Sequence, residues 1–113
     1  MGRGQAPAAR LIIVPRQLWI LTDAVVEIEA AQTWYEAQRP GLGDEFLGAI
    51  ESAVESLLAF PEACPVDYRD ARRCLVERFP YCLYYRVESD GVVVVALLHA
   101  ARDPARKRRR LRG

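Results

Sequence analysis

The chain has 113 residues, 51% of them hydrophobic and 27% charged, which is the composition of one small globular domain. Its three cysteines, Cys64, Cys74 and Cys82, form no CxxC pair, which argues against a disulfide scaffold and against a zinc site. The longest apolar run, from Val92 to Ala101, is far shorter than the roughly 20 residues of a membrane span. We therefore expect a soluble cytoplasmic protein with no metal, no cofactor and no membrane contact.

The net charge of +1 is the sum of two opposite halves. Residues 1–70 hold five Arg against eleven Asp or Glu, a balance of −6, whereas residues 71–113 hold eleven Lys or Arg against four Asp or Glu, a balance of +7. Such asymmetry indicates that one face of the protein meets an anionic partner. The alternative is a basic disordered tail, because residues 106–112 supply six of the positive charges.

The patterning divides the chain into one domain and two tails. Residues 1–16 are rich in Gly, Ala, Pro and Arg and show no hydrophobic period, so we expect a mobile or extended tail. Residues 17–104 hold all the strand and helix patterns and form the single domain. Residues 105–113 are read as a basic C-terminal tail.

The first half of the domain predicts a strand followed by two helices. Gln17–Leu21 is a short apolar strand, after which Thr22 and Asp23 offer a helix N-cap. Apolar residues at steps of four, three and four then predict a helix that runs to about Gln38 and stops at Arg39-Pro40-Gly41. A second helix follows, with a clean apolar stripe made by Phe46, Leu47, Ile50, Ala53, Val54, Leu57 and Leu58.

The second half changes to the period of β-strands. Residues 73–79, 81–88 and 92–98 are rich in β-branched and aromatic side chains, and Ser89-Asp90-Gly91 is a hairpin signal. In the middle strand, Leu83, Tyr85 and Val87 should share one face, and the valine run after Gly91 predicts a central strand covered on both sides. The expected class is α+β: a helical hairpin packed on a small, largely antiparallel four-stranded sheet, in the order β-α-α-β-β-β.

Three segments carry a recognisable pattern: residues 34–43 (WYEAQRPGLG), residues 78–87 (RFPYCLYYRV), and residues 92–99 followed by Arg102-Asp103-Pro104. In this order they resemble the RelE/ParE family of bacterial toxins, over roughly residues 18–104. The resemblance implies the RelE/ParE-like fold. It also implies a toxin of a type II toxin–antitoxin, or plasmid-stabilisation, module that inhibits growth and is neutralised by a cognate antitoxin, as a homodimer or a toxin–antitoxin hetero-oligomer.

Some members of that family are ribosome-dependent mRNA endonucleases, and others poison DNA gyrase. If this chain is a nuclease, the candidate catalytic residues are Arg78, Arg86, His99 and Arg102. His99 is the only histidine and could transfer a proton near neutral pH, while the arginines could stabilise phosphate charge. The structural alternatives are that His99 ends its strand and satisfies a loop carbonyl, and that Arg78 and Arg86 are ordinary strand arginines.

The sequence departs from the catalytic pattern of the mRNA-cleaving members. They often read His-x-Arg-Arg, but Ala101 stands at the third position here, and no aromatic residue follows Tyr85. We therefore favour a ParE-like toxin that binds gyrase and carries out no chemistry. The alternatives are a RelE-like mRNA endonuclease acting on the ribosome, and an inactive member that serves as a binding module.

Basic residues of the second half are the candidates for binding the target or the antitoxin. They are Arg73, Arg78, Arg86, Arg102, Arg106, Lys107 and Arg108.

Overall fold

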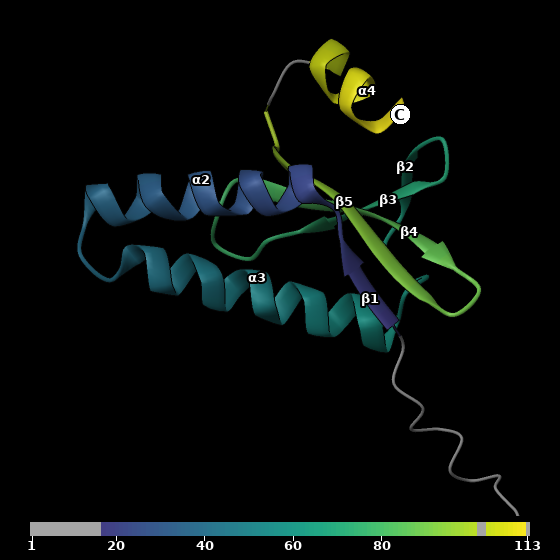
Figure 1. Cartoon of the computed structure of the whole chain (residues 1–113), viewed down its shortest axis with the longest axis horizontal. Helices are drawn as coiled ribbons and strands as arrows, with labels where there is room; N and C mark the ends of the chain where they lie inside the picture. Colours follow the sequence, from purple (N-terminus) through teal and green to yellow (C-terminus); the bar gives the residue numbers. More distant parts are fainter. Residues whose placement is uncertain (1–16, 102–103, 113) are drawn as a thin grey trace, which may run out of the picture.

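The computed structural model describes residues 17–101 and 104–112 and places them in a five-stranded sheet with helices on both faces (Figure 1). Residues 1–16, predicted to be a tail, lie outside the described residues. The elements are β1 (Gln17–Ile20), α2 (Thr22–Gln38), α3 (Leu42–Ala59), β2 (Val66–Tyr68), β3 (Ala71–Leu75), β4 (Tyr81–Glu88), β5 (Gly91–His99) and α4 (Pro104–Arg112). The predicted α+β class and its opening order of strand, helix and helix are confirmed.

The sheet has one strand more than the sequence predicts. Its order is β1-β5-β4-β3-β2, with β1 parallel to β5 and all other neighbours antiparallel. The prediction of four strands was wrong because β2 is only three residues long, too short to show a period. The strand predicted over residues 73–79 is β3, which ends earlier, at Leu75. There the chain turns: the Val76 N–H donates to the Tyr81 carbonyl at 2.9 Å, and Arg78 takes a φ of 72°.

The parallel pair β1–β5 joins the two ends of the domain. Gln17 lies opposite Gly91, and the pairing continues to Ile20 opposite Val94. A Cβ atom at Gly91 would collide with the backbone carbonyl of Gln17, so this position admits only glycine. The glycine of the predicted hairpin signal is therefore required by the neighbouring strand β1.

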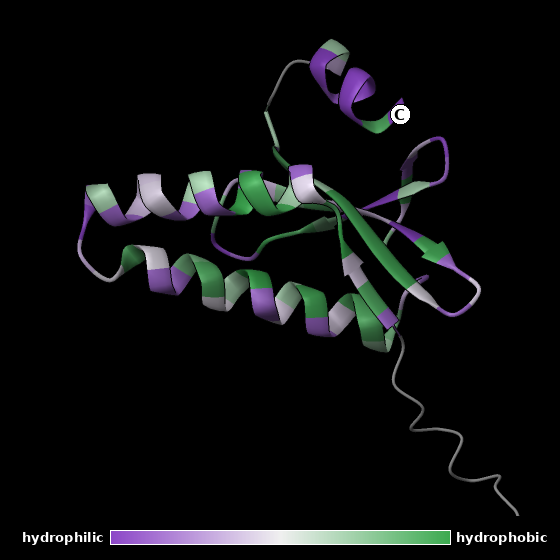
Figure 2. Cartoon of the chain, in the orientation of Figure 1, coloured by the Kyte–Doolittle hydropathy of each residue, from purple (hydrophilic) through white to green (hydrophobic). Residues whose placement is uncertain are grey.

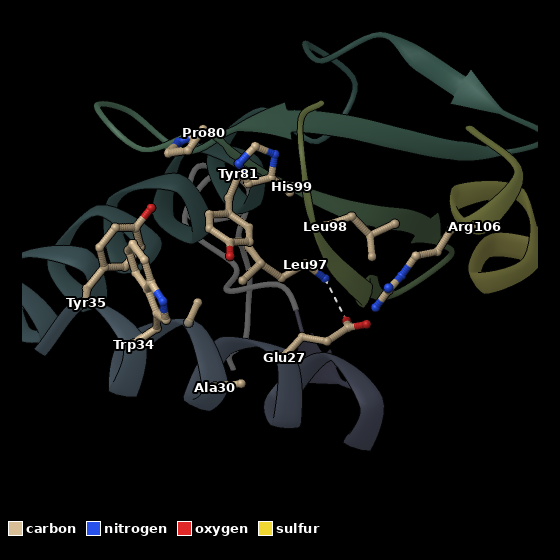
Figure 3. Close-up of a pocket in the computed structure, with 11 residues that line it drawn as sticks. Glu27, Ala30, Trp34, Tyr35, Pro80, Tyr81, Leu97, Leu98, His99 and Arg106 are labelled. Atoms are coloured by element: carbon tan, nitrogen blue, oxygen red, sulfur yellow. Dashed lines mark hydrogen bonds between the residues drawn. The ribbon is translucent and has the colours of Figure 1, made fainter. Parts of the chain in front are cut away.

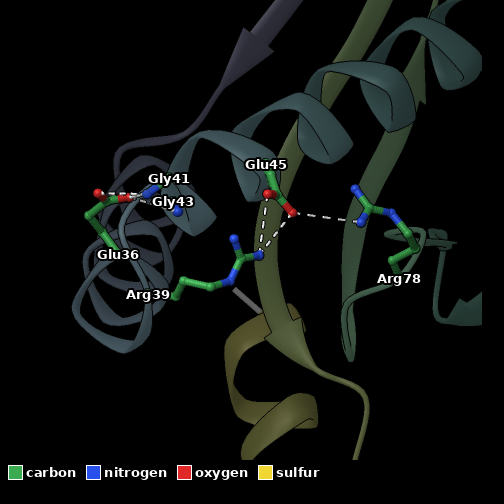
Figure 4. Close-up of polar contacts among 6 residues, drawn as sticks. All are labelled: Glu36, Arg39, Gly41, Gly43, Glu45 and Arg78. Carbon is green, nitrogen blue, oxygen red and sulfur yellow. Dashed lines mark hydrogen bonds and ion pairs between the residues drawn. The ribbon is translucent and has the colours of Figure 1, made fainter.

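The helices α2 and α3 form the predicted hairpin and cover one face of the sheet. Gly41, at a φ of 90°, makes the turn between them, and the Glu36 carboxylate accepts the N–H groups of Gly41 and Gly43 at 3.0 and 2.9 Å (Figure 4). These two donors hold the pKa of Glu36 below its usual value. The predicted N-cap of the first helix does not form, because Leu21 occupies that position and makes no side-chain hydrogen bond.

The strands β4 and β5 separate two hydrophobic clusters, as the sequence predicts. Leu83 and Tyr85 lie in the cluster under the helical hairpin, and Cys82 and Tyr84 in the cluster on the other face. Figure 2 shows β5 hydrophobic along nearly all of its length, as expected of a strand covered on both sides.

A bulge interrupts the regular alternation of β5. Tyr84 pairs with Ala96 but Tyr85 pairs with Val94, so Val95 has no partner on β4. Val95 and Ala96 therefore both face away from the hairpin, and Leu97 returns to the hairpin side.

The second face of the sheet is covered by α4, a helix that the sequence analysis did not predict. Leu111 is buried against this face, with 1% of its surface exposed, and the Arg86 guanidinium donates to its carbonyl at 3.1 Å. Lys107 pairs with Asp67 of β2 at 2.9 Å. The sequence predicted a basic tail over residues 105–113, but residues 105–112 belong to a packed helix. Figure 1 shows this helix beside β2 and β3.

We predict that Leu57→Ala costs about 2–5 kcal/mol of unfolding free energy, because Leu57 is 1% exposed in the cluster under the hairpin. Glu51→Ala, on the exposed side of the same helix, should cost less than about 0.5 kcal/mol. Urea unfolding measures both. Equal losses would mean that the buried face of α3 is assigned wrongly.

Candidate functional site

A pocket of about 620 Å³ opens between α2, the end of β5 and the start of α4 (Figure 3). Its lining combines small apolar residues of one helix, aromatic rings, one histidine and one arginine. The lining residues are Glu27, Ala30, Ala31, Trp34, Tyr35, Pro80, Tyr81, Leu97, Leu98, His99 and Arg106. Residues that are distant in sequence, from 27 to 106, therefore meet at one concave surface.

The pocket lies where β5 extends beyond the end of its neighbour β1. The short strand β1 pairs with β5 only as far as Val94, but β5 continues to His99. Backbone groups of an unpaired strand edge need other hydrogen-bond partners. Two side chains supply them at the bulge: Glu27 accepts the Leu97 N–H at 3.0 Å, and Arg110 donates to the Val95 carbonyl at 3.2 Å.

Glu27 and Arg110 also bind each other. The Arg110 guanidinium donates to both carboxylate oxygens of Glu27, each at 2.8 Å, in a forked arrangement. Both side chains are about one quarter exposed, so solvent screens this pair less than a surface ion pair. The pair joins α2, β5 and α4, and its Glu27 side chain lines the pocket.

Beyond this pair, the edge of β5 remains open to the pocket. Alternate residues of a strand direct their backbone groups to the same side. Because the Leu97 N–H points to Glu27, the backbone groups of Leu97 and His99 face away from β4. The Trp34 ring, 59% exposed, and Ala30 lie along the same pocket. An extended apolar segment of another chain fits such a surface.

His99 has a defined local role in this arrangement. Its Nδ1 atom accepts the Ala101 N–H at 3.1 Å, and its ring lies edge-on to Tyr81 with centroids 5.3 Å apart. The sequence suggested a bond to a loop carbonyl, but the ring accepts a backbone N–H instead. The acceptor role requires that Nδ1 carries no proton.

Of the three catalytic candidates that the structure describes, only His99 lines the pocket. Arg78 lies in the turn before β4, where it is exposed and 3.9 Å from Glu45, which also binds Arg39 (Figure 4). Arg86 is held by Asp70 at 2.9 Å and by the Leu111 carbonyl, so its guanidinium fastens α4 to the sheet. Arg102 lies outside the described residues.

The remaining binding candidates lie in different surroundings. Arg106 lines the pocket, whereas Lys107 is committed to Asp67. Arg108 is exposed on α4, and Arg73 is exposed on β3. Only one of these cations therefore belongs to the pocket.

Glu27 and Arg110, which are 83 residues apart, were not predicted from the sequence. Lys107, Arg110 and Leu111 follow the i, i+3, i+4 spacing of a helix face that packs. That spacing was the available signal, but four further arginines in the same segment concealed it.

In the described part of the chain, no group of three His, Cys, Asp or Glu side chains is arranged to hold a metal ion. No helix there is long and apolar enough to cross a bilayer.

Comparison with known proteins places this fold. The family model for the ParE toxin of the type II toxin–antitoxin system parDE matches residues 20–104. A solved structure described as the chromosomal ParDE TA system from P. aeruginosa matches with a TM-score of 0.66 and 17% identity, covering 74% of this chain and 95% of that chain. At that identity the match concerns the fold. No curated protein matches this chain in sequence.

We predict that Arg110→Ala destabilises the fold by about 1–3 kcal/mol, because it leaves the Val95 carbonyl without its side-chain donor and the Glu27 carboxylate without its paired cation. The neighbouring Arg109→Ala is the matched control. Arg109 is exposed, so the loss there should stay within about 0.5 kcal/mol. Urea unfolding compares the two variants, and similar losses would show that the pair with Glu27 does not hold α4.

Proposed function

The chain belongs to the ParE toxin family of type II toxin–antitoxin systems, and from this premise we propose that it inhibits bacterial growth by binding DNA gyrase until its cognate antitoxin neutralises it. The proposal assigns the protein a binding function in the cytoplasm and no reaction of its own. It rests on one observation above all: among the described residues, the pocket offers a surface for another chain but brings only Arg106 as a cation beside His99.

RNA cleavage needs a base, an acid and cations within hydrogen-bond reach of one phosphate. In the pocket, His99 is joined by one cation, Arg106, while Arg86 is fastened to Asp70 and Arg78 lies beside Glu45. The Nδ1 atom of His99 is also occupied by a backbone N–H. These commitments favour binding over catalysis.

The same pocket suits an antitoxin segment. Trp34 and Ala30 offer apolar contact, the open edge of β5 offers backbone groups, and Arg106 offers a positive charge. An extended segment with apolar and acidic side chains would meet all three features. Antitoxin binding at this site would therefore bury the exposed tryptophan.

The second candidate function is an mRNA endonuclease that acts on the ribosome. One observation favours it: His99, Arg106 and the exposed ring of Trp34 share a pocket in which a nucleobase could stack. In that case His99 would transfer the proton.

Two assays on the purified full-length chain separate the candidates. A gyrase poison should inhibit supercoiling of relaxed plasmid by gyrase and leave ribosome-bound mRNA intact. We predict this result, and we predict that His99→Ala still arrests growth, because there is no proton transfer to lose. Ribosome-dependent mRNA cleavage that disappears in His99→Ala would instead establish the nuclease.

A second prediction concerns the antitoxin. Trp34→Ala should weaken its binding about tenfold or more, because exposed aromatic anchors carry much of the binding energy of an interface. Phe60→Ala is the control, since Phe60 is 70% exposed at the end of α3 and does not line the pocket. Calorimetric titration with the protein encoded beside the toxin measures both. An unchanged Trp34→Ala variant would place the antitoxin elsewhere.

A further inference from the structure

The outward side of α4 presents several exposed cations. The exposed residues of this helix are Pro104, Arg106, Arg108, Arg109 and Arg112. Arg106 turns to the pocket. The other three arginines, Arg108, Arg109 and Arg112, form with Arg69 in the turn between β2 and β3 a surface that we call the arginine face.

The inward side of α4 packs against the rest of the domain. Lys107 binds Asp67, Arg110 binds Glu27 and lies 3.9 Å from Asp23, and Leu111 is buried. Arg108 and Arg109 make no ion pair with any described residue. Their charges are therefore a cost to the isolated protein through mutual repulsion, and packing does not explain them.

Tyr68 joins Arg69 to α4. The Arg69 guanidinium lies 5.5 Å from the centroid of the Tyr68 ring, and Arg69 and Arg112 both contact the Tyr68 hydroxyl. The two cations hold the pKa of this phenol below its usual value, with Arg69 as the larger cause. The arginine face is thus continuous from the helix to the turn, and the one neighbouring acid, Asp70, is already paired with Arg86 at 2.9 Å.

Arg69 occupies a backbone conformation that favours glycine. Its φ is 55°, in the left-handed region that non-glycine residues rarely adopt and that costs them free energy. A turn selected for stability alone would have Gly or Asn at this position. A strained arginine at the rim of a cationic surface indicates that its side chain is needed there.

We propose that the arginine face binds the phosphate backbone of duplex DNA, independently of base sequence. Guanidinium groups match phosphate oxygens in a forked geometry, and they release condensed counterions when they bind. A protein partner is less suited to this surface, because the exposed side of α4 offers arginines and one proline but no aromatic or large aliphatic anchor.

This contact goes beyond the proposed function. A toxin that acts on gyrase meets an enzyme whose substrate is DNA, so the arginine face would bind the DNA while another part of the surface binds the enzyme. Direct binding to DNA is nevertheless measurable without gyrase. The two ideas can therefore fail separately.

The test compares two double variants that remove the same charge. Arg108→Gln/Arg109→Gln alters the arginine face, and Arg39→Gln/Arg78→Gln removes two exposed arginines beside Glu45. Fluorescence anisotropy with a short labelled duplex, between about 50 and 200 mM NaCl, gives the slope of log Kobs against log salt. Circular dichroism and thermal unfolding establish that both variants are folded.

Each phosphate contact contributes about 0.9 to that slope. We expect the first double variant to lower its magnitude by about 2, and the second to leave it within error of the unaltered chain. Two duplexes of unrelated sequence should bind equally. Equal effects of the two double variants, or no binding at the lowest salt, would overturn the inference.

The variant Arg69→Gly provides an independent test of the inference. It relieves the strained backbone while it removes a cation, so it should raise the melting temperature and weaken DNA binding together. A purely structural role for Arg69 predicts no change in DNA affinity.

If DNA binding is absent and supercoiling is still inhibited, the DNA contact is wrong and the gyrase proposal stands. If an acidic peptide gives the same variant-dependent salt slope as the duplex, the surface is not specific for DNA and the inference is also wrong.

Discussion

The carboxylate of Glu27 is the point on which the pocket, the bulge and the last helix all depend. The strand β5 continues to His99, but its parallel neighbour β1 pairs with it only as far as Val94. The backbone groups of β5 beyond Val94 therefore have no strand partner on that side. Glu27 accepts one of them and binds Arg110, which donates to another. Breaking this pair would remove the donor of the Val95 carbonyl and one of the contacts that hold α4, because unsatisfied polar groups in a partly buried place are costly.

The two sides of the helix α4 have different roles. Its inner side, with Lys107, Arg110 and Leu111, closes the second cluster of the sheet. Its outer side and its first turn carry charges that the fold leaves available. The basic half that the sequence reveals is therefore neither a free tail nor a uniform surface. Part of its charge cancels the acidic residues of α2 and β2, and only the remainder is available to partners.

Sequence periodicity predicted the parts of the fold that are local. The helical hairpin and the two faces of β4 follow from spacings of 3.6 and 2, and Leu57 and Tyr85 are buried as those spacings require. The strand β2 and the helix α4 were missed, since one has three residues and the other a single buried side chain. Within the site, His99 was found because it is the only histidine. Glu27 was not, because its role depends on Leu97 and Arg110, which lie far along the chain.

The pairing of Gln17 with Gly91 has a consequence for how the protein is made. The strand β5 follows all the other strands in the sequence, so β1 has no strand partner until residues 91–94 have been synthesised. Contacts so distant in sequence form late and slowly. The pocket lining spans residues 27 to 106, so a nascent chain that stops before β5 has the α2 side of the pocket without the side opposite it. Translation therefore makes one wall of the pocket well before the wall that faces it.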